Sequence, residues 1–159
     1  MSVTVSQTQT LAQSASTPRR TTRFLDSRPV WLVGVLAVLA GAVVTEAFSL
    51  VCRAAGVPMA AASPGAKEAA EIPVGGFAGG VIFWSVAGVV LAVALARWAG
   101  RPARTFTAIT VALTALSLAG PAVAPHTATS TQIVLSVSHV VAAAVIIPLL
   151  ARRLAHRSR

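Results

Sequence analysis

The sequence is poor in the residues from which soluble catalytic sites are built. Its 159 residues include no tyrosine, one cysteine and four acidic residues, and only 11% of them are charged. Soluble domains carry about 25% charged residues, so the composition lies far from that class. The single cysteine, Cys52, excludes an intrachain disulfide and a cysteine-based metal site.

Long apolar runs take the place of charge. Hydrophobic residues make up 55% of the chain and gather in four blocks, at about 30–52, 76–98, 106–124 and 132–151. The first block would span roughly 34 Å as a helix, enough for a hydrocarbon core of about 30 Å. Backbone amides find no water to bond within lipid, so each block is predicted to be a transmembrane helix.

The predicted fold is an all-α integral membrane four-helix bundle of up-down-up-down topology. The link from 99 to 103 is short, which makes the second and third helices antiparallel neighbours. Residues 1–29 are rich in Ser, Thr and Gln, so we expect a disordered cytoplasmic tail before the four-helix domain of 30–152. Residues 153–159 are expected to form a basic cytoplasmic tail.

The positive charge is unevenly placed along the chain. The net charge is +9, and all but two of the 13 Lys and Arg lie in segments predicted to share one side of the membrane. Arg53 and Lys67 are the two exceptions. This bias predicts a bacterial plasma membrane protein with both termini in the cytoplasm. Without an RNA-binding aromatic motif, the charge favours a lipid bilayer as partner and does not indicate nucleic acid.

Small and hydroxyl-bearing residues recur at helical spacing within the blocks. Close backbone approach and hydrogen bonds drive helix association in lipid, and small residues permit both. The residues predicted to pack against neighbouring helices are Gly34, Gly41, Gly88, Thr110, Thr114 and Ser117. For the second block, an alternative is that Ala and Gly are simply common in this chain.

Two ionisable residues, Glu46 and His139, lie well inside the predicted bilayer. Counted from the outer ends of their helices, they lie roughly 9 Å and 10 Å deep. Buried ionisable groups in membranes usually face the bundle interior and find partners, so we expect a Glu46–His139 hydrogen bond. Such a pair is compatible with a proton relay, with a structural polar contact, or with Glu46 simply reaching up to water.

Catalytic and cofactor-binding patterns are absent from the sequence. It contains no His-Glu-x-x-His zinc motif, and Asp26 and His156 lie in segments expected to be disordered. No cofactor and no metal site is therefore predicted, and the chain is not expected to be an enzyme.

Three segments carry a resemblance to a known family. They are Arg28-Pro29-Val30-Trp31, the stretch from Gly79 to Trp98 with Phe83-Trp84, and the run from Ser138-His139 to Arg152. In these the chain resembles a family of short, uncharacterised actinobacterial membrane proteins defined by a domain of unknown function. The resemblance covers roughly residues 28–155 and implies four membrane helices without implying an activity.

The sequence as a whole favours a non-enzymatic accessory or structural envelope protein. It would act through a membrane protein partner or as a homo-oligomer. The alternative is a small proton-coupled transporter or channel that uses Glu46 and His139.

Overall fold

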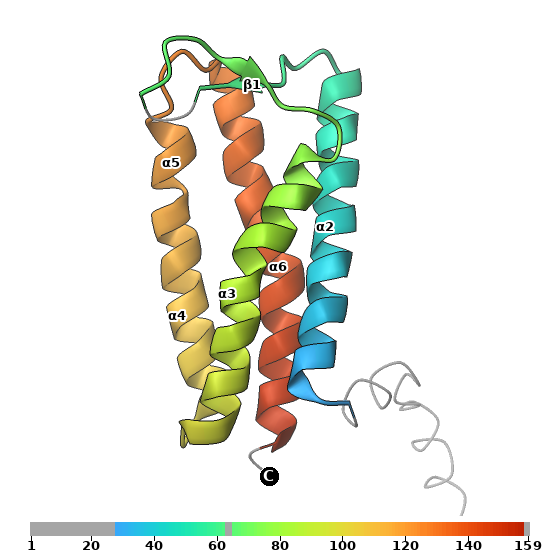
Figure 1. Ribbon diagram of the computed structural model, residues 1–159, viewed down its shortest axis with the longest axis vertical. Helices are drawn as coiled ribbons and strands as arrows, with labels where there is room; N and C mark the ends of the chain where they lie inside the picture. The colour runs from blue at the N-terminus through green and yellow to red at the C-terminus, as the bar shows by residue number, and fades with distance from the viewer. Residues whose placement is uncertain (1–27, 63–64, 158–159) are drawn as a thin grey trace, which may run out of the picture.

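The computed structural model describes residues 28–62 and 65–157, and four long helices dominate it (Figure 1). Their bounds are α2 at Val30–Ala54, α3 at Gly76–Trp98, α4 at Pro102–Ser117 and α6 at Thr129–Arg157. A short helix, α5 at Ala119–Ala122, continues the line of α4. The predicted all-α membrane bundle is confirmed, while the tail predicted at 1–29 lies almost wholly outside the described residues.

Four segments are long and apolar enough to cross a membrane, namely Val30–Ala54, Gly76–Trp98, Pro102–Ala122 and Thr129–His156. The third begins four residues before the predicted start at 106 and combines α4 with α5. Pro121 explains the break between these two helices, because a proline ring clashes with the carbonyl four residues earlier, here that of Ser117. The last helix continues beyond 151 through the arginines that follow its apolar run.

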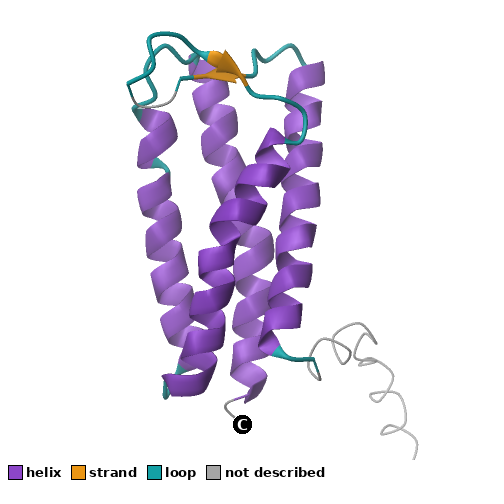
Figure 2. Ribbon diagram, viewed as in Figure 1, coloured by secondary structure: helices purple, strands orange, loops and turns teal. Residues whose placement is uncertain are grey.

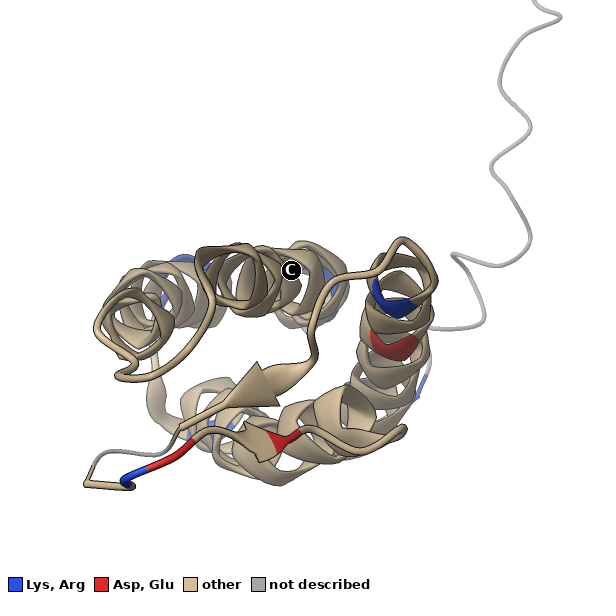
Figure 3. Ribbon diagram, turned by 90° about the horizontal axis from the view of Figure 1, so that it is seen from above, with Lys and Arg blue, Asp and Glu red and all other residues tan. Residues whose placement is uncertain are grey.

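The two ends of the bundle differ in what they carry. At one end, the strands β1 (Ala60–Ala61) and β2 (Ala70–Glu71) form a small antiparallel hairpin in which Ala60 pairs with Glu71. This hairpin end is at the top of Figures 1 and 2. The opposite end is called the arginine-rich end, after Arg97, Arg101, Arg104, Arg152 and Arg153. Figure 3 looks down from the hairpin end, where the acidic residues of α2 and of the hairpin segments lie.

Helix α6 packs between α2 and α4, and α3 packs mainly against α2. Two apolar clusters fill the bundle. The cluster near the arginine-rich end consists of Val30, Ala92, Phe106, Leu150 and Leu154, and all five side chains are almost fully buried. A smaller cluster of Met59, Phe77 and Val134 lies under the hairpin. The larger of the two buried clusters therefore lies at the end remote from the hairpin.

The glycines predicted to pack closely divide into two groups. A Cβ at Gly34 would come within 2.9 Å of Val89 Cγ1, and one at Gly41 would come within 2.8 Å of Ile146 Cγ1. A Cβ at Gly88 would meet nothing within 4 Å, so the packing prediction for Gly88 is wrong. Val89 is the α3 residue that faces Gly34, and one residue earlier on a helix points about 100° away.

The hydroxyl groups of the stripe on α4 find their hydrogen-bond acceptors within the same helix. Thr110 Oγ1 donates to the Phe106 carbonyl at 2.7 Å, Thr114 Oγ1 to the Thr110 carbonyl at 2.8 Å, and Ser117 Oγ to the Thr114 carbonyl at 2.7 Å. The three residues are half-buried. Bonds to the preceding turn remove the cost of placing hydroxyls in lipid, so the stripe does not depend on a neighbouring helix for partners.

Candidate functional site

Glu46 lies on α2, two turns before the helix ends, and both of its carboxylate oxygens accept hydrogen bonds from α3. The Gly75 N–H donates to Oε1 at 2.7 Å, and the Ala78 N–H donates to Oε2 at 2.9 Å. Ser49 Oγ donates to the backbone carbonyl of Glu46 at 2.9 Å and lies 3.4 Å from Oε1. The carboxylate is thus bound to the N-terminus of the neighbouring helix.

The sequence before α3 explains why this helix takes its cap from elsewhere. Helix N-termini leave their first N–H groups without intrahelical partners. Ser, Thr, Asp or Asn usually supplies a side-chain acceptor, but Gly75 occupies the N-cap of α3 and no side-chain bond caps it. Gly75 has φ +87°, a left-handed conformation that favours glycine. A carboxylate at this helix end also interacts favourably with the helix dipole.

Arg53 joins the end of α2 to strand β2. Its Nη1 lies 3.3 Å from Glu71 Oε1, and its Nη2 donates to the Ile72 carbonyl at 2.5 Å. The Glu71 side chain is 79% exposed, and an exposed ion pair of this kind contributes about 0–1 kcal/mol. We call Glu46, Ser49, Arg53 and Glu71, together with the first turn of α3, the Glu46 cluster.

His139 lies on α6 and is not part of the Glu46 cluster. Its Nδ1 lies 2.7 Å from the Leu135 carbonyl, one turn earlier on the same helix. Among residues 28–62 and 65–157, no hydrogen bond or ion pair joins Glu46 to His139, so the structure does not bring the expected pair together. Similar depth in the bilayer does not fix the direction in which two side chains point, and the N–H groups of α3 bind the carboxylate.

A second set of hydrogen bonds joins the loops of the hairpin end to one another and to the first turn of α6. Thr131 Oγ1, fully buried, donates to the Pro58 carbonyl, and the Ala62 N–H donates to Thr127 Oγ1 at 3.1 Å. Gln132 Nε2 donates to the Ala124 carbonyl at 3.0 Å. These contacts were not predicted from the sequence. The only signal available was the concentration of hydroxyl and amide side chains at residues 127–132.

The arrangement binds backbone and does not resemble a catalytic constellation. The Glu46 carboxylate already accepts two backbone N–H donors, one on each oxygen, and Arg53 pairs with Glu71 of β2. Within the described part of the chain, no group of three His, Cys, Asp or Glu is placed to hold a metal ion. One buried hydroxyl, Thr45 Oγ1, has no partner, although Thr45 is only 1% exposed.

Fold and site together define a multi-pass membrane protein whose intramembrane acid binds a helix terminus. A family model matches residues 25–156, and the chain belongs to that family, the family of unknown function DUF6069. No curated protein and no solved structure matches the chain.

Proposed function

We propose that the protein is a non-enzymatic accessory or structural membrane protein that acts through a membrane partner or through copies of itself. The observation that carries this proposal is the use of Glu46. A residue that shuttles protons needs a carboxylate open to exchange, whereas both oxygens of Glu46 accept N–H donors from α3. The hydroxyls of α4 are likewise bonded to their own helix.

The proposal includes an orientation in a bacterial plasma membrane. The arginine-rich end would face the cytoplasm, and the hairpin end would face outward, because cytoplasmic loops carry an excess of Lys and Arg. Both termini would then lie in the cytoplasm. The hairpin end, with three of the four acidic residues of the sequence, fits the outer side of such a membrane.

Proton flux separates this proposal from a proton-coupled transporter. The full chain would be reconstituted into proteoliposomes with an interior pH dye, and a proton gradient would be applied. We expect the wild type, Glu46→Gln and empty vesicles to leak protons at the same rate. A flux in the wild type that Glu46→Gln abolishes would establish the transporter instead.

The orientation has its own measurement. In a Cys52→Ser background, Lys67→Cys marks the hairpin end and Arg101→Cys marks the arginine-rich end. A membrane-impermeant maleimide added to intact spheroplasts is expected to label the cysteine at 67 and to spare the one at 101. The reverse labelling would refute the proposed orientation without changing the fold.

A further inference from the structure

A cleft on the outside of the bundle separates α4 from α6 close to the arginine-rich end. Its volume is about 640 Å³, within the range of 300–1,000 Å³ that is usual for ligand sites. Arg104, Ala108 and Val111 line it on α4, and Ala151 and Arg152 line it on α6. Alanines on both helices leave a gap because they are too small to fill the space between the backbones.

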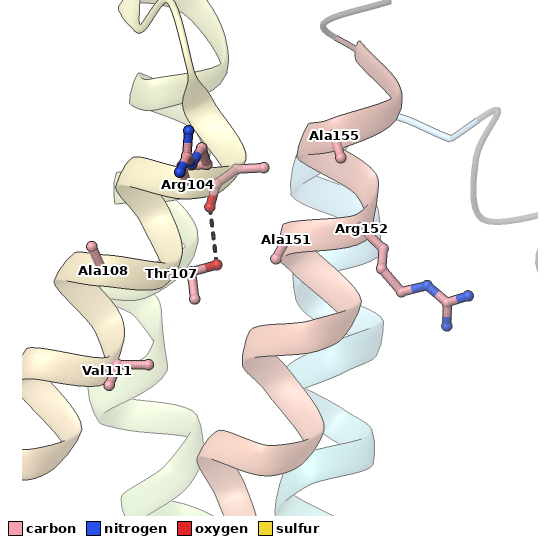
Figure 4. Close-up of a pocket in the computed structure, with 8 residues that line it drawn as sticks. Arg104, Thr107, Ala108, Val111, Ala151, Arg152 and Ala155 are labelled. Carbon is pink, nitrogen blue, oxygen red and sulfur yellow. Dashed lines mark hydrogen bonds between the residues drawn. The ribbon is translucent and has the colours of Figure 1, made fainter.

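The floor of the cleft is apolar. Thr107 also lines it, but its hydroxyl donates to the Ala103 carbonyl at 2.9 Å, as the dashed line in Figure 4 marks. The hydroxyl is therefore already paired, and the walls below it present methyl groups from alanines and Val111. A hydrocarbon chain fits such a surface.

One arginine on each of the two helices contributes to the lining of this apolar cleft. Arg104 lies near the start of α4, and Arg152 extends from α6 on the side away from α4 (Figure 4). Both side chains are exposed, and neither makes a hydrogen bond or ion pair with any residue that the structure describes. Long arginine side chains lie along apolar surface with their charge turned to the headgroups, and the Arg152 side chain reaches the mouth of the cleft by turning across α6 from the position it has in this structure.

The dimensions of the cleft suit one leaflet of a bilayer. From Ala103 to Val111 the cleft follows nine residues of α4, or roughly 12 Å. Half of a hydrocarbon core is roughly 15 Å thick. An acyl chain lying against the alanines would therefore stay within one leaflet, and its headgroup would meet the two arginines at the surface.

We propose that this cleft binds an anionic phospholipid, with one acyl chain along α4 and α6 and the phosphate held by Arg104 and Arg152. Basic pockets between transmembrane helices bind anionic headgroups in this way. Helix α4 begins at Pro102 without a side-chain cap, so the N–H groups of Ala103 and Arg104 in its first turn are further donors for a phosphate at the cleft mouth.

Charge also argues against a second copy of the chain as the occupant. Two copies inserted with the same orientation would bring their arginine-rich ends together. Within the described residues, the acids Glu46, Glu68 and Glu71 all lie on the segments of the hairpin half and offer no compensation at this end. An anionic lipid would neutralise the charge of the arginines, whereas a second copy of the chain would add more positive charge at this end.

Native mass spectrometry of the full chain in detergent tests the charge requirement. Equimolar phosphatidylglycerol and phosphatidylcholine with identical acyl chains would be offered together. We expect retention of phosphatidylglycerol, reduced about fivefold by Arg104→Gln or Arg152→Gln, the effect of one arginine near an anionic surface. Arg97→Gln, an exposed arginine at the same end but outside the cleft, is the matched control and should leave binding unchanged.

Filling the cleft tests its shape. Ala108→Leu should weaken phosphatidylglycerol retention, whereas Ala87→Leu, at an exposed alanine of α3 that does not line the cleft, should not. Circular dichroism would establish that each variant keeps its helices. Equal retention of the two lipids, or equal losses in cleft and control variants, would overturn the proposal. Efficient disulfide-linked dimers of Ala108→Cys in a Cys52→Ser background would overturn it in favour of a second copy.

Discussion

At the hairpin end of the bundle, side chains hold the helices and loops together through hydrogen bonds to backbone. At the arginine-rich end, α2, α3, α4 and α6 meet in apolar packing around Phe106, Leu150 and Leu154. Hydrogen bonds of the first kind depend on particular atoms, such as the Glu46 carboxylate. Packing depends on volume and tolerates changes of identity that preserve volume.

Because of this difference, we expect substitutions at the two ends to change the stability of the bundle in different ways. A conservative apolar exchange is tolerated at the arginine-rich end. At the hairpin end, the removal of one oxygen atom leaves a particular N–H donor without its acceptor.

The largest effect is expected from Phe106→Ala. The side chain is 1% exposed, and its loss leaves a cavity among α3, α4 and α6. We expect the free energy of unfolding to fall by about 3 kcal/mol, the low end of the range for soluble cores. The effect lies at the low end because unfolded helices in lipid keep their apolar surroundings. Unfolding by dodecyl sulfate in mixed micelles measures it.

Phe83→Ala is the matched control, because Phe83 is 70% exposed and contacts Trp84 edge to face with 5.2 Å between ring centroids. We expect a loss of about 1 kcal/mol or less. Equal losses at Phe83 and Phe106 would contradict the burial of Phe106 in the larger apolar cluster.

The next effect is expected from Glu46→Ala, which strips the first turn of α3 of its acceptor. Hydrogen bonds to charged groups contribute about 1.5–3 kcal/mol, and we expect a loss of about 2 kcal/mol in the same unfolding assay. Glu46→Gln keeps one acceptor oxygen and should lose about half as much. The loss in unfolding free energy caused by His139→Ala should be the same in the Glu46→Ala background as in the wild type. Strongly non-additive losses in the double mutant would instead be evidence for the Glu46–His139 contact that the sequence suggested.

A smaller effect is expected from Gly34→Ala. The new Cβ would lie 2.9 Å from Val89 Cγ1, and the branched valine is stiff, so the helices must separate slightly. We expect a loss of about 1 kcal/mol. Gly88→Ala, which meets nothing within 4 Å, should be neutral or stabilising by up to about 1 kcal/mol. Melting temperatures of the two variants in one detergent compare them directly. If both variants melted lower than the wild type, the difference in packing between Gly34 and Gly88 would be contradicted.

The smallest effect is expected from Glu71→Gln. The ion pair with Arg53 is largely exposed, so its loss should cost less than about 1 kcal/mol. High salt should shrink the difference between wild type and variant, since salt screens exposed charges. Melting at low and high salt measures this. A large, salt-independent loss would mean that the Arg53–Glu71 pair contributes more to the stability of the hairpin end than its exposure suggests.

The sequence predicted the helices well because hydropathy reports directly on lipid. The second helix begins and ends where expected, at Gly76 and Trp98. The ends of the others were less accurate, since α6 continues into Arg152 and Arg153, where the apolar signal stops while helical hydrogen bonding does not. The start of α4 moved to Pro102, a residue that favours the first turn of a helix.

The candidate site was predictable only in part. The sequence identified Glu46 as a residue that needs a partner, because of its depth in an apolar run. It did not identify the partner, since hydropathy says nothing of how α2 and α3 are rotated about their axes. One signal was available, namely that Ile72-Pro73-Val74-Gly75 offers no side-chain acceptor to cap α3.

The bond between Glu46 and α3 also bears on the order of membrane insertion. Synthesis proceeds from the N-terminus, so α2 emerges from the ribosome before residues 75 to 78 do. Until α3 arrives, α2 holds a carboxylate without its two backbone donors. Each of the two helices therefore supplies hydrogen-bond partners that the other lacks, and α2 reaches its final state in the bilayer only when α3 packs against it.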